Sequence, residues 1–212
     1  CYRARASPVV SSISEGVSRL MDNFILKTDS YKLTHWKMYP DDVTKVYSYL
    51  EPRTGEGYQR VVWFGLQALL KRYFEGVVVT REMLDEAEDL ANCHFSTRQF
   101  NRQGWERIVK VHGGRLPIEI CAAPEGHMYD RGTPLMTVEN TDPQLPWLTN
   151  AVESLLMHVW YPSTVATVSG DLKRFFQKEV PDGLHNFMLH DFGYRGVSSD
   201  ESAEMGGMAH LV

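Results

Sequence analysis

The sequence predicts an α/β fold, because segments with a strand pattern alternate with segments that have the spacing of helices. Residues 43–51 (VTKVYSYLE) alternate and are rich in Val and Tyr, which is typical of a strand. Apolar residues recur at helical spacing from Met83 onward, behind Thr80, a suitable N-cap. The 212 residues are 43% hydrophobic and 23% charged, a globular composition whose length predicts one domain or slightly more.

The remaining elements follow from periodicity and from the residues that end helices. The clearest amphipathic helix is predicted at 146–160, and Pro162 should stop it. A helix around Trp105 should close at Gly113 and Gly114. Further helices are expected at 64–74 and 164–179, and short strands at 116–122, 134–139 and 184–189.

The two ends of the sequence differ from the rest. Residues 1–20 contain Arg and Ser but a single acid, Glu15, which loosely suggests a targeting peptide; an upstream leader, with Met21 as the start, is the alternative that we favour. We expect 1–20 to be a disordered leader. The last four residues, 209–212, are apolar and would leave an element unfinished, so we expect a truncated sequence.

Charge and cysteine usage narrow the function classes. The formal charge of −5 weighs against a general nucleic-acid binder, which would usually be basic. No apolar run approaches the roughly 18 residues of a membrane helix. The three cysteines are odd in number and far apart, so we expect buried free thiols in a reducing compartment. A cytoplasmic protein without nucleic-acid or membrane partners is therefore predicted.

The most informative segment is 190–201 (HDFGYRGVSSDE), which follows the strand expected at 184–189. Its glycines would permit a tight turn, and Ser198 with Glu201 has the spacing of a capping box that begins a helix. Free backbone N–H groups at such a helix start can bind an anion. An ordinary turn between strand and helix is the alternative.

Three side chains in this segment suit a ligand that is both flat and charged. Arg195 offers a planar cation that matches phosphate. Phe192 and Tyr194 offer flat faces for an aromatic ring, although packed aromatic side chains would give the same pattern. Asp191-Phe192-Gly193 also matches the metal-binding triplet of protein kinases, but the other kinase motifs are absent.

Two further segments mix residue types that often serve function. Residues 28–35 (TDSYKLTH) include Tyr31 and Asp29, where Asp29 could cap a helix. Arg53 comes just after the strand at 43–51, although a solvated arginine is the alternative. The histidines form no zinc pattern, and no metal site is predicted, although His185 and His190 could meet Asp191 at a metal ion. His158 is expected in the core or at an interface.

Several separate blocks together resemble the nicotinamide phosphoribosyltransferase family. They occur in the family's order from about residue 23 to residue 212, and residues 1–20 lie outside the match. A lone tripeptide would be weak, but many collinear blocks are specific. The blocks are TDSYK at 28–32 with Thr34 and His35, KVYSY at 45–49, LPIEI at 116–120, VENTDP at 138–143, WYP at 160–162 with TVAT at 164–167, and residues 190–199.

The resemblance implies a fold, a reaction and a site. The family is similar to the type II phosphoribosyltransferases, whose members have an α+β region beside an irregular α/β barrel and work as homodimers with shared active sites. They transfer phosphoribosyl from phosphoribosyl pyrophosphate, with Mg²⁺, to nicotinamide, giving nicotinamide mononucleotide and pyrophosphate in NAD salvage. Phe192 would stack on one face of the pyridine ring, and Tyr31 from the partner subunit on the other. Arg195 would hold the diphosphate, and Arg53 is a further candidate for phosphate.

The resemblance also implies what is missing. Family members are more than twice as long, so residues 21–212 would be an N-terminal portion that stops within the barrel and carries no catalytic residue. We therefore expect the chain to be inactive alone. Two alternatives stay open. One is a nicotinate-specific phosphoribosyltransferase, and the other is a dimerisation module without catalysis.

Overall fold

A computed structural model describes residues 22–53, 57–95, 97, 99–180, 184 and 187–212, so the expected leader at 1–20 lies outside the described part. The described residues divide into two compact units. The first unit is made of described residues within 22–46, Tyr73–Ile118 and Asn140–Leu155. The second is drawn from Tyr47–Arg72, Glu119–Glu139 and Leu156–Val212.

The first unit is mainly helical, and its helices begin and end at residues with clear local reasons. Helix α3 (Arg81–Phe95) starts where Thr80 Oγ1 accepts a hydrogen bond of 3.3 Å from the Met83 amide. Helix α4 (Arg102–His112) ends at Gly113, whose φ of 60° is the left-handed conformation that glycine adopts freely. Three short 3₁₀ helices precede them, namely η1 (Phe24–Leu26), η2 (Ser30–Leu33) and η3 (His35–Met38).

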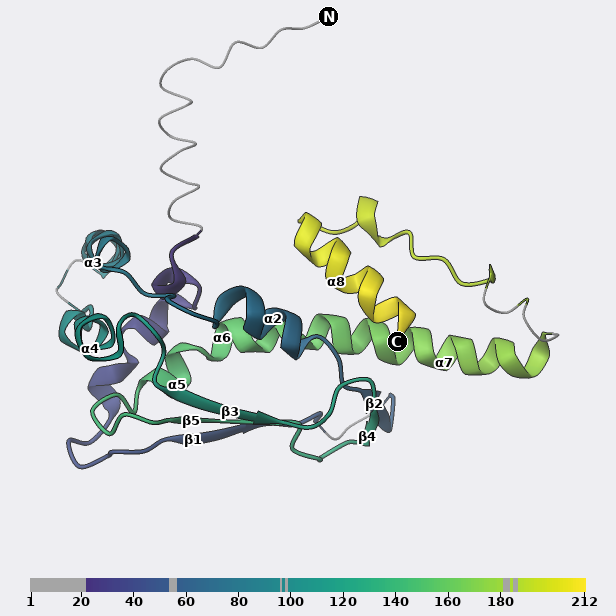
Figure 1. Cartoon of the computed structure of the whole chain (residues 1–212), viewed down its shortest axis with the longest axis horizontal. Helices are drawn as coiled ribbons and strands as arrows, with labels where there is room; N and C mark the ends of the chain where they lie inside the picture. Colours follow the sequence, from purple (N-terminus) through teal and green to yellow (C-terminus); the bar gives the residue numbers. More distant parts are fainter. Residues whose placement is uncertain (1–21, 54–56, 96, 98, 181–183, 185–186) are drawn as a thin grey trace, which may run out of the picture. The chain divides into compact units, whose positions relative to one another are not determined.

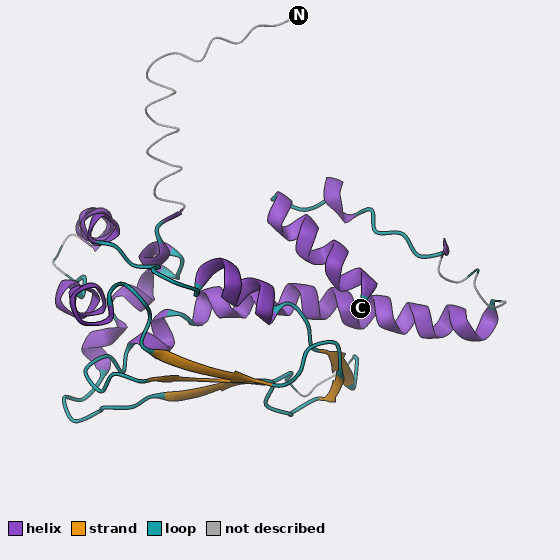
Figure 2. Ribbon diagram, in the orientation of Figure 1, coloured by secondary structure: helices purple, strands orange, loops and turns teal. Residues whose placement is uncertain are grey.

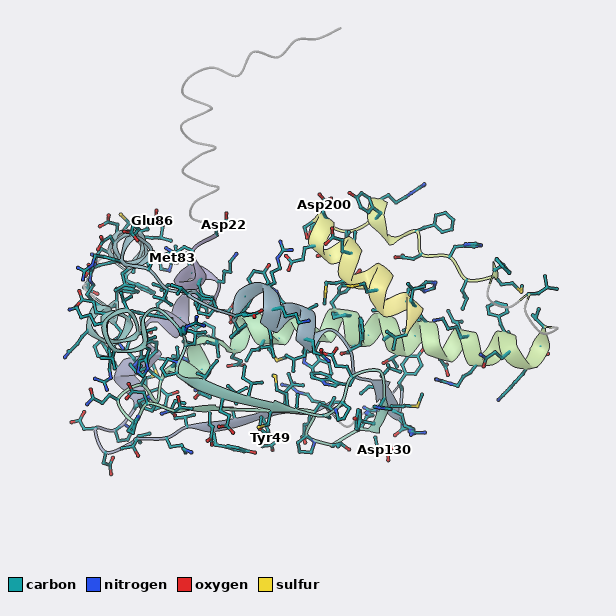
Figure 3. All side chains as sticks on the ribbon, in the orientation of Figure 1. Asp22, Tyr49, Met83, Glu86, Asp130 and Asp200 are labelled. Atoms are coloured by element: carbon teal, nitrogen blue, oxygen red, sulfur yellow. The ribbon has the colours of Figure 1, made fainter. Side chains whose placement is uncertain are left out.

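The beginning of the described chain is held against α3. The side-chain nitrogen of the fully buried Asn23 donates hydrogen bonds to the Met83 carbonyl at 2.8 Å and to the Glu86 carboxylate at 3.3 Å. Figure 3 shows Met83 and Glu86 on α3 beside Asp22, where the described chain starts. A buried amide that is satisfied in this way fixes the entry of the chain into the first unit.

A buried carboxylate ties α4 to the segment after the last strand. Asp142 accepts hydrogen bonds from Arg107 Nε at 2.6 Å, from His112 Nε2 at 2.7 Å and from the Gln144 amide at 2.9 Å. Its side chain is only 4% exposed. A buried charge requires partners of this kind. The cluster therefore joins α4 to the segment that follows β5 within the first unit.

Two small sheets carry the described strands. Strands β1 (Tyr47–Leu50), β5 (Met136–Asn140) and β3 (Ile118–Ala122) lie in the order β1-β5-β3, with β1 antiparallel to β5 (Figure 2). Along β5 every second side chain is buried, as the pleat of a strand requires. Strands β2 (Arg60–Val62) and β4 (Met128–Asp130) pair antiparallel in the other sheet.

The helices of the second unit include a close pair. Helix α8 (Asp200–Leu211) packs against α7 (Trp160–Glu179), as Figure 1 shows. Ala203, Gly206 and Ala209, spaced three residues apart, are the buried residues of α8. A Cβ added at Gly206 would lie 2.8 Å from the Tyr161 hydroxyl, so this small residue permits the close contact. Helix α2 (Leu66–Tyr73) begins just after Gly65.

The α/β prediction is confirmed, and the predicted helices at 64–74, around Trp105 and at 164–179 are present. The helix expected at 146–160 is instead interrupted, as α5 (Leu148–Ala151), α6 (Glu153–Leu156) and the 3₁₀ helix η4 (Met157–Val159). Pro162 does not stop a helix. It lies in the first turn of α7, where its missing N–H has no partner to lose.

The predicted strand at 184–189 is wrong for the residues that are described there. Leu184 and Met188 lie in turns, and the Phe187 amide donates to the Leu184 carbonyl at 3.0 Å. Strands β2 and β4 were not expected, because three residues are too few to display an alternating pattern.

Candidate functional site

Residues 190–196 form a short, tightly folded segment that ends in the 3₁₀ helix η6 (Gly193–Arg195). The Asp191 carboxylate accepts a hydrogen bond of 2.7 Å from the Gly193 amide, and the Gly196 amide donates to the Gly193 carbonyl at 2.8 Å. Neither glycine has a positive φ. A Cβ at Gly193 would lie 2.8 Å from Asp191 Oδ1, so glycine is needed there for the close approach of this carboxylate.

The aromatic side chains of the segment are exposed and differ in their contacts. Phe192 and Tyr194 are each 70% exposed. The Tyr194 hydroxyl donates a hydrogen bond of 2.8 Å to Asp200, and this bond is the main reason that the pKa of Tyr194 is raised. The Phe192 ring lies 6.2 Å from the His190 ring and faces solvent. Phe192 is thus the better candidate for stacking on a ligand, because its neighbour Tyr194 is already engaged.

Arg195 is exposed in the same short helix as Tyr194, so the segment presents a ring and a cation together. The sequence placed them side by side, and the structure shows that neither is buried in a core. A planar guanidinium on the same short segment as the exposed Phe192 ring can bind a ligand that carries both an aromatic group and a phosphate.

The helix after the segment begins one residue later than predicted. Ser199, not Ser198, is the N-cap of α8, and its hydroxyl accepts a hydrogen bond of 3.2 Å from the Ser202 amide. The Glu201 carboxylate, expected in the capping box, pairs with Arg72 of α2 at 3.3 Å. The helix start that we expected therefore exists, with a different capping residue.

A groove of about 720 Å³ opens beside Ser198 and Ser199, within the second unit. Its walls come from α2, from the end of η4 and the start of α7, and from α8. His158 lines it and is exposed, so the expected core position is wrong for this histidine within the described chain. The lining residues are Ala68, Leu69, Lys71, Arg72, His158, Tyr161, Pro162, Ser198, Ser199, Glu201, Ser202, Glu204, Met205 and Met208.

Tyr31 lies in the first unit, on η2, and is 53% exposed. Its ring meets His35 edge to face, with 4.9 Å between ring centroids. The next residue, Lys32, has a buried side chain that pairs with Glu153 of α6. The backbone under the exposed ring is therefore fixed by an ion pair.

Asp29 precedes η2 but does not cap it through its side chain. Instead, its carboxylate accepts a hydrogen bond of 2.5 Å from the Ser154 hydroxyl. The expected capping role is thus wrong, and Asp29 serves as a further tie between η2 and α6.

Arg53 lies in the second unit, with an exposed side chain. Its backbone carbonyl accepts a hydrogen bond of 2.7 Å from Arg131 Nε, and the preceding Pro52 carbonyl accepts one of 2.9 Å from Gly132. These bonds fix the chain at Arg53 while leaving its guanidinium free to meet solvent. The turn that follows, 54–56, lies outside the described residues.

Within the described part of the chain, no three His, Cys, Asp or Glu side chains come together as a metal site. The arrangement of His185 with His190 and Asp191 cannot be placed, since His185 lies outside the described residues. Cys93 and Cys121 are free thiols, as expected, but they are exposed rather than buried. Among the described helices, none has both the length and the apolar character that crossing a membrane requires.

Comparisons with known proteins agree on one family. Residues 23–120 match the family model described as "Nicotinamide phosphoribosyltransferase, N-terminal domain". The chain is 45% identical, over 91% of its length, to a nicotinamide phosphoribosyltransferase of Xanthomonas campestris, of which it covers 42%. It is 30% identical to relatives with the same name from Acinetobacter baylyi and Mycoplasma pneumoniae, covering 40% and 47% of them. The chain thus spans less than half the length of these relatives.

The fold is also similar to a solved structure. Over 86% of the chain, the structure resembles human nicotinic acid phosphoribosyltransferase with a TM-score of 0.58, and the match covers 34% of that protein. At 17% identity, this likeness shows the fold alone.

Proposed function

We propose that this chain, whose residues 23–120 match the N-terminal domain of nicotinamide phosphoribosyltransferase, belongs to that family and supplies one wall of the active site of such an enzyme. The reaction is the transfer of phosphoribosyl from phosphoribosyl pyrophosphate to nicotinamide, in NAD salvage. The observation that carries the proposal is that Phe192 and Arg195, three residues apart in the 190–196 segment, are both exposed. In this proposal, residues 21–212 are the N-terminal portion of a longer, cytoplasmic enzyme.

The chemistry of the transfer suits these groups. When pyrophosphate leaves, the ribosyl centre gains oxocarbenium character, and negative charge builds up on the departing oxygens. Arg195 would offset that charge, with Arg53 as a second cation, and Mg²⁺ would arrive with the diphosphate. The nicotinamide ring nitrogen is already nucleophilic, so the site needs no base to activate it. What the protein must supply is alignment of that ring.

Alignment is the role that we give to the aromatic residues. Phe192 would cover one face of the pyridine ring, and Tyr31 of a second copy would cover the other face. Tyr31 is exposed on a backbone fixed by Lys32 and Glu153, which suits a side chain that reaches into another subunit. Stacking is worth about 0.5–1.5 kcal/mol per aromatic pair beyond burial, so it orients the substrate without accounting for the rate.

The proposal implies that the chain is inactive alone, because it spans less than half the length of the relatives that it matches. Assaying the 212-residue chain for nicotinamide mononucleotide is the direct test, and no product is expected. Turnover comparable to that of a full-length relative would contradict this part of the proposal.

A chimera tests the site itself. In this chimera, residues 21–212 of the chain replace the matching part of the Xanthomonas campestris relative, which is 45% identical. In that chimera, Phe192→Ala should raise the KM for nicotinamide about three- to tenfold, and Phe192→Tyr should restore it. Phe187→Ala is the matched control, since Phe187 is 75% exposed but lies before the segment. Equal effects of the two alanine variants would overturn the role of Phe192.

Comparing nicotinamide with nicotinate as substrates of the complete protein separates the first alternative, since a preference for nicotinate would favour the nicotinate-specific enzyme. A stable dimer of the chain, together with a chimera that is folded but inactive, would favour an association module. The names of the curated relatives support nicotinamide as the substrate.

A further inference from the structure

We propose that His210 is a positioning residue that holds the backbone entering the 190–196 segment against helices α7 and α8. The proposal rests on the proposed function only for what the segment does, because the contacts themselves belong to this chain.

The imidazole of His210 has a partner on each ring nitrogen. Its Nδ1 lies 2.9 Å from the Ser169 hydroxyl oxygen, and its Nε2 lies 3.4 Å from the Leu189 carbonyl oxygen. A carbonyl oxygen can only accept, so we assign the hydrogen to Nε2. Nδ1 then accepts from the Ser169 hydroxyl. The neutral tautomer thus satisfies both contacts at once.

His210 and its two partners belong to three separate parts of the second unit. Ser169 is buried on α7, His210 lies in the last turn of α8, and Leu189 directly precedes the segment that carries Phe192. The ring therefore joins two packed helices to an otherwise irregular stretch of chain. Leu189 and His210 are 21 residues apart, so their contact depends on tertiary folding.

The segment is attached to α8 at its other end as well. Tyr194 donates to Asp200 at the first residue of α8, which Figure 3 labels, while His210 acts at the last turn. In between, Asp191 Oδ2 would lie 3.7 Å from a Cβ added at Gly207, in the body of the same helix. The segment therefore runs along α8 between two anchors, of which His210 is the one before Phe192.

Two variants of His210 divide its contacts. In His210→Gln the side-chain nitrogen can take the place of Nε2 and donate to Leu189. In His210→Asn the shorter amide takes the place of Nδ1 and keeps Ser169 but does not reach Leu189. Both are uncharged and polar, so a loss that comes from helix packing alone should be similar in the two.

Hydrogen exchange of the 212-residue chain tests the proposal without any enzyme assay. In His210→Asn, the amides of Gly193, Gly196 and Val197 should exchange about fivefold faster, the effect of about 1 kcal/mol for one hydrogen bond. In His210→Gln they should keep the parent rates. Equal exchange in both variants, or faster exchange that spreads through α7 and α8, would overturn the positioning role.

The chimera adds a readout on substrate. His210→Asn should raise the KM for nicotinamide while kcat stays within about twofold, and His210→Gln should rescue it. An unchanged KM in a variant whose segment exchanges faster would count against the nicotinamide site and would still support the positioning role. An unchanged exchange rate in His210→Asn would overturn the positioning role, whatever the KM.

Discussion

Replacing Asp142 by asparagine should destabilise the first unit strongly. Burial alone would raise the pKa of the Asp142 carboxyl, but hydrogen bonds from Arg107, His112 and the Gln144 amide outweigh burial and lower that pKa to about 2. Asparagine has the same shape but no charge, and its NH2 group donates where one carboxylate oxygen accepts, so it cannot satisfy Arg107, His112 and the Gln144 amide as the carboxylate does.

The lowered pKa sets the size of the effect. Relative to the ordinary value of 3.8, it corresponds to about 2.5 kcal/mol of stability at pH 7. Losing the charge and one acceptor oxygen at a side chain that is 4% exposed adds to this, so Asp142→Asn should cost about 2–4 kcal/mol. Because the folded pKa lies below the unfolded one, the contribution is complete well above pH 4 and falls as the pH approaches 2. About a quarter of it should be gone by pH 3.5.

Urea unfolding at pH 7 and at pH 3.5 measures both quantities, with the fluorescence of Trp105 and Trp147 as probes inside the first unit. Asp85→Asn is the control, because Asp85 lies in the same unit, is 58% exposed where it pairs with Arg102 and should contribute less than about 1 kcal/mol. The reasoning fails if both variants lose the same free energy, or if the loss in Asp142→Asn is as large at pH 3.5 as at pH 7.

Two further predictions concern the second unit, and each compares neighbouring or matched positions by thermal unfolding. Gly65→Ala should cost at least about 2 kcal/mol more than Gly57→Ala: both glycines have φ near +100°, but only at Gly65 would the new Cβ lie 2.4 Å from Pro162; equal losses would contradict the clash. Ser199→Ala should cost about 1 kcal/mol and Ser198→Ala close to nothing, because Ser199 alone caps α8, and the reverse order would restore Ser198 as the cap.

Helix ends were predictable where the cause is local. Thr80 and Gly113 act on backbone groups within five residues of themselves, so the sequence alone contains the whole interaction. The prediction of one helix at 146–160 was wrong, because local spacing does not show where such a run is interrupted. Its apolar spacing continues through three short elements, and a proline after such a run can either end a helix or stand in the first turn of the next. At Pro162 the second outcome holds, and local pattern does not distinguish the two.

The candidate site was predictable only in part. Phe192 and Arg195 are close in sequence, so their common exposure on one short segment follows once that segment is folded on the surface. The contacts that hold the segment are different. His210 reaches Ser169 across 41 residues, and no spacing rule links them. Phe192 and Arg195 could be predicted from their residue types, whereas the residues that position them are found only from tertiary contacts.

The contacts that hold the 190–196 segment explain how a single exposed ring could orient a substrate. Stacking on Phe192 would contribute about 0.5–1.5 kcal/mol beyond burial, whereas fixing the backbone of one flexible residue costs about 1–2 kcal/mol. A segment that had to become ordered around the ligand would therefore lose more than the ring supplies. The segment is already ordered in the folded chain, so the entropy of ordering it is lost on folding and not on ligand binding. Three contacts order it: Asp191 with Gly193, Tyr194 with Asp200, and His210 with Leu189. Phe192 can be exposed and still be oriented, because the restraint lies in its neighbours and not in the ring itself.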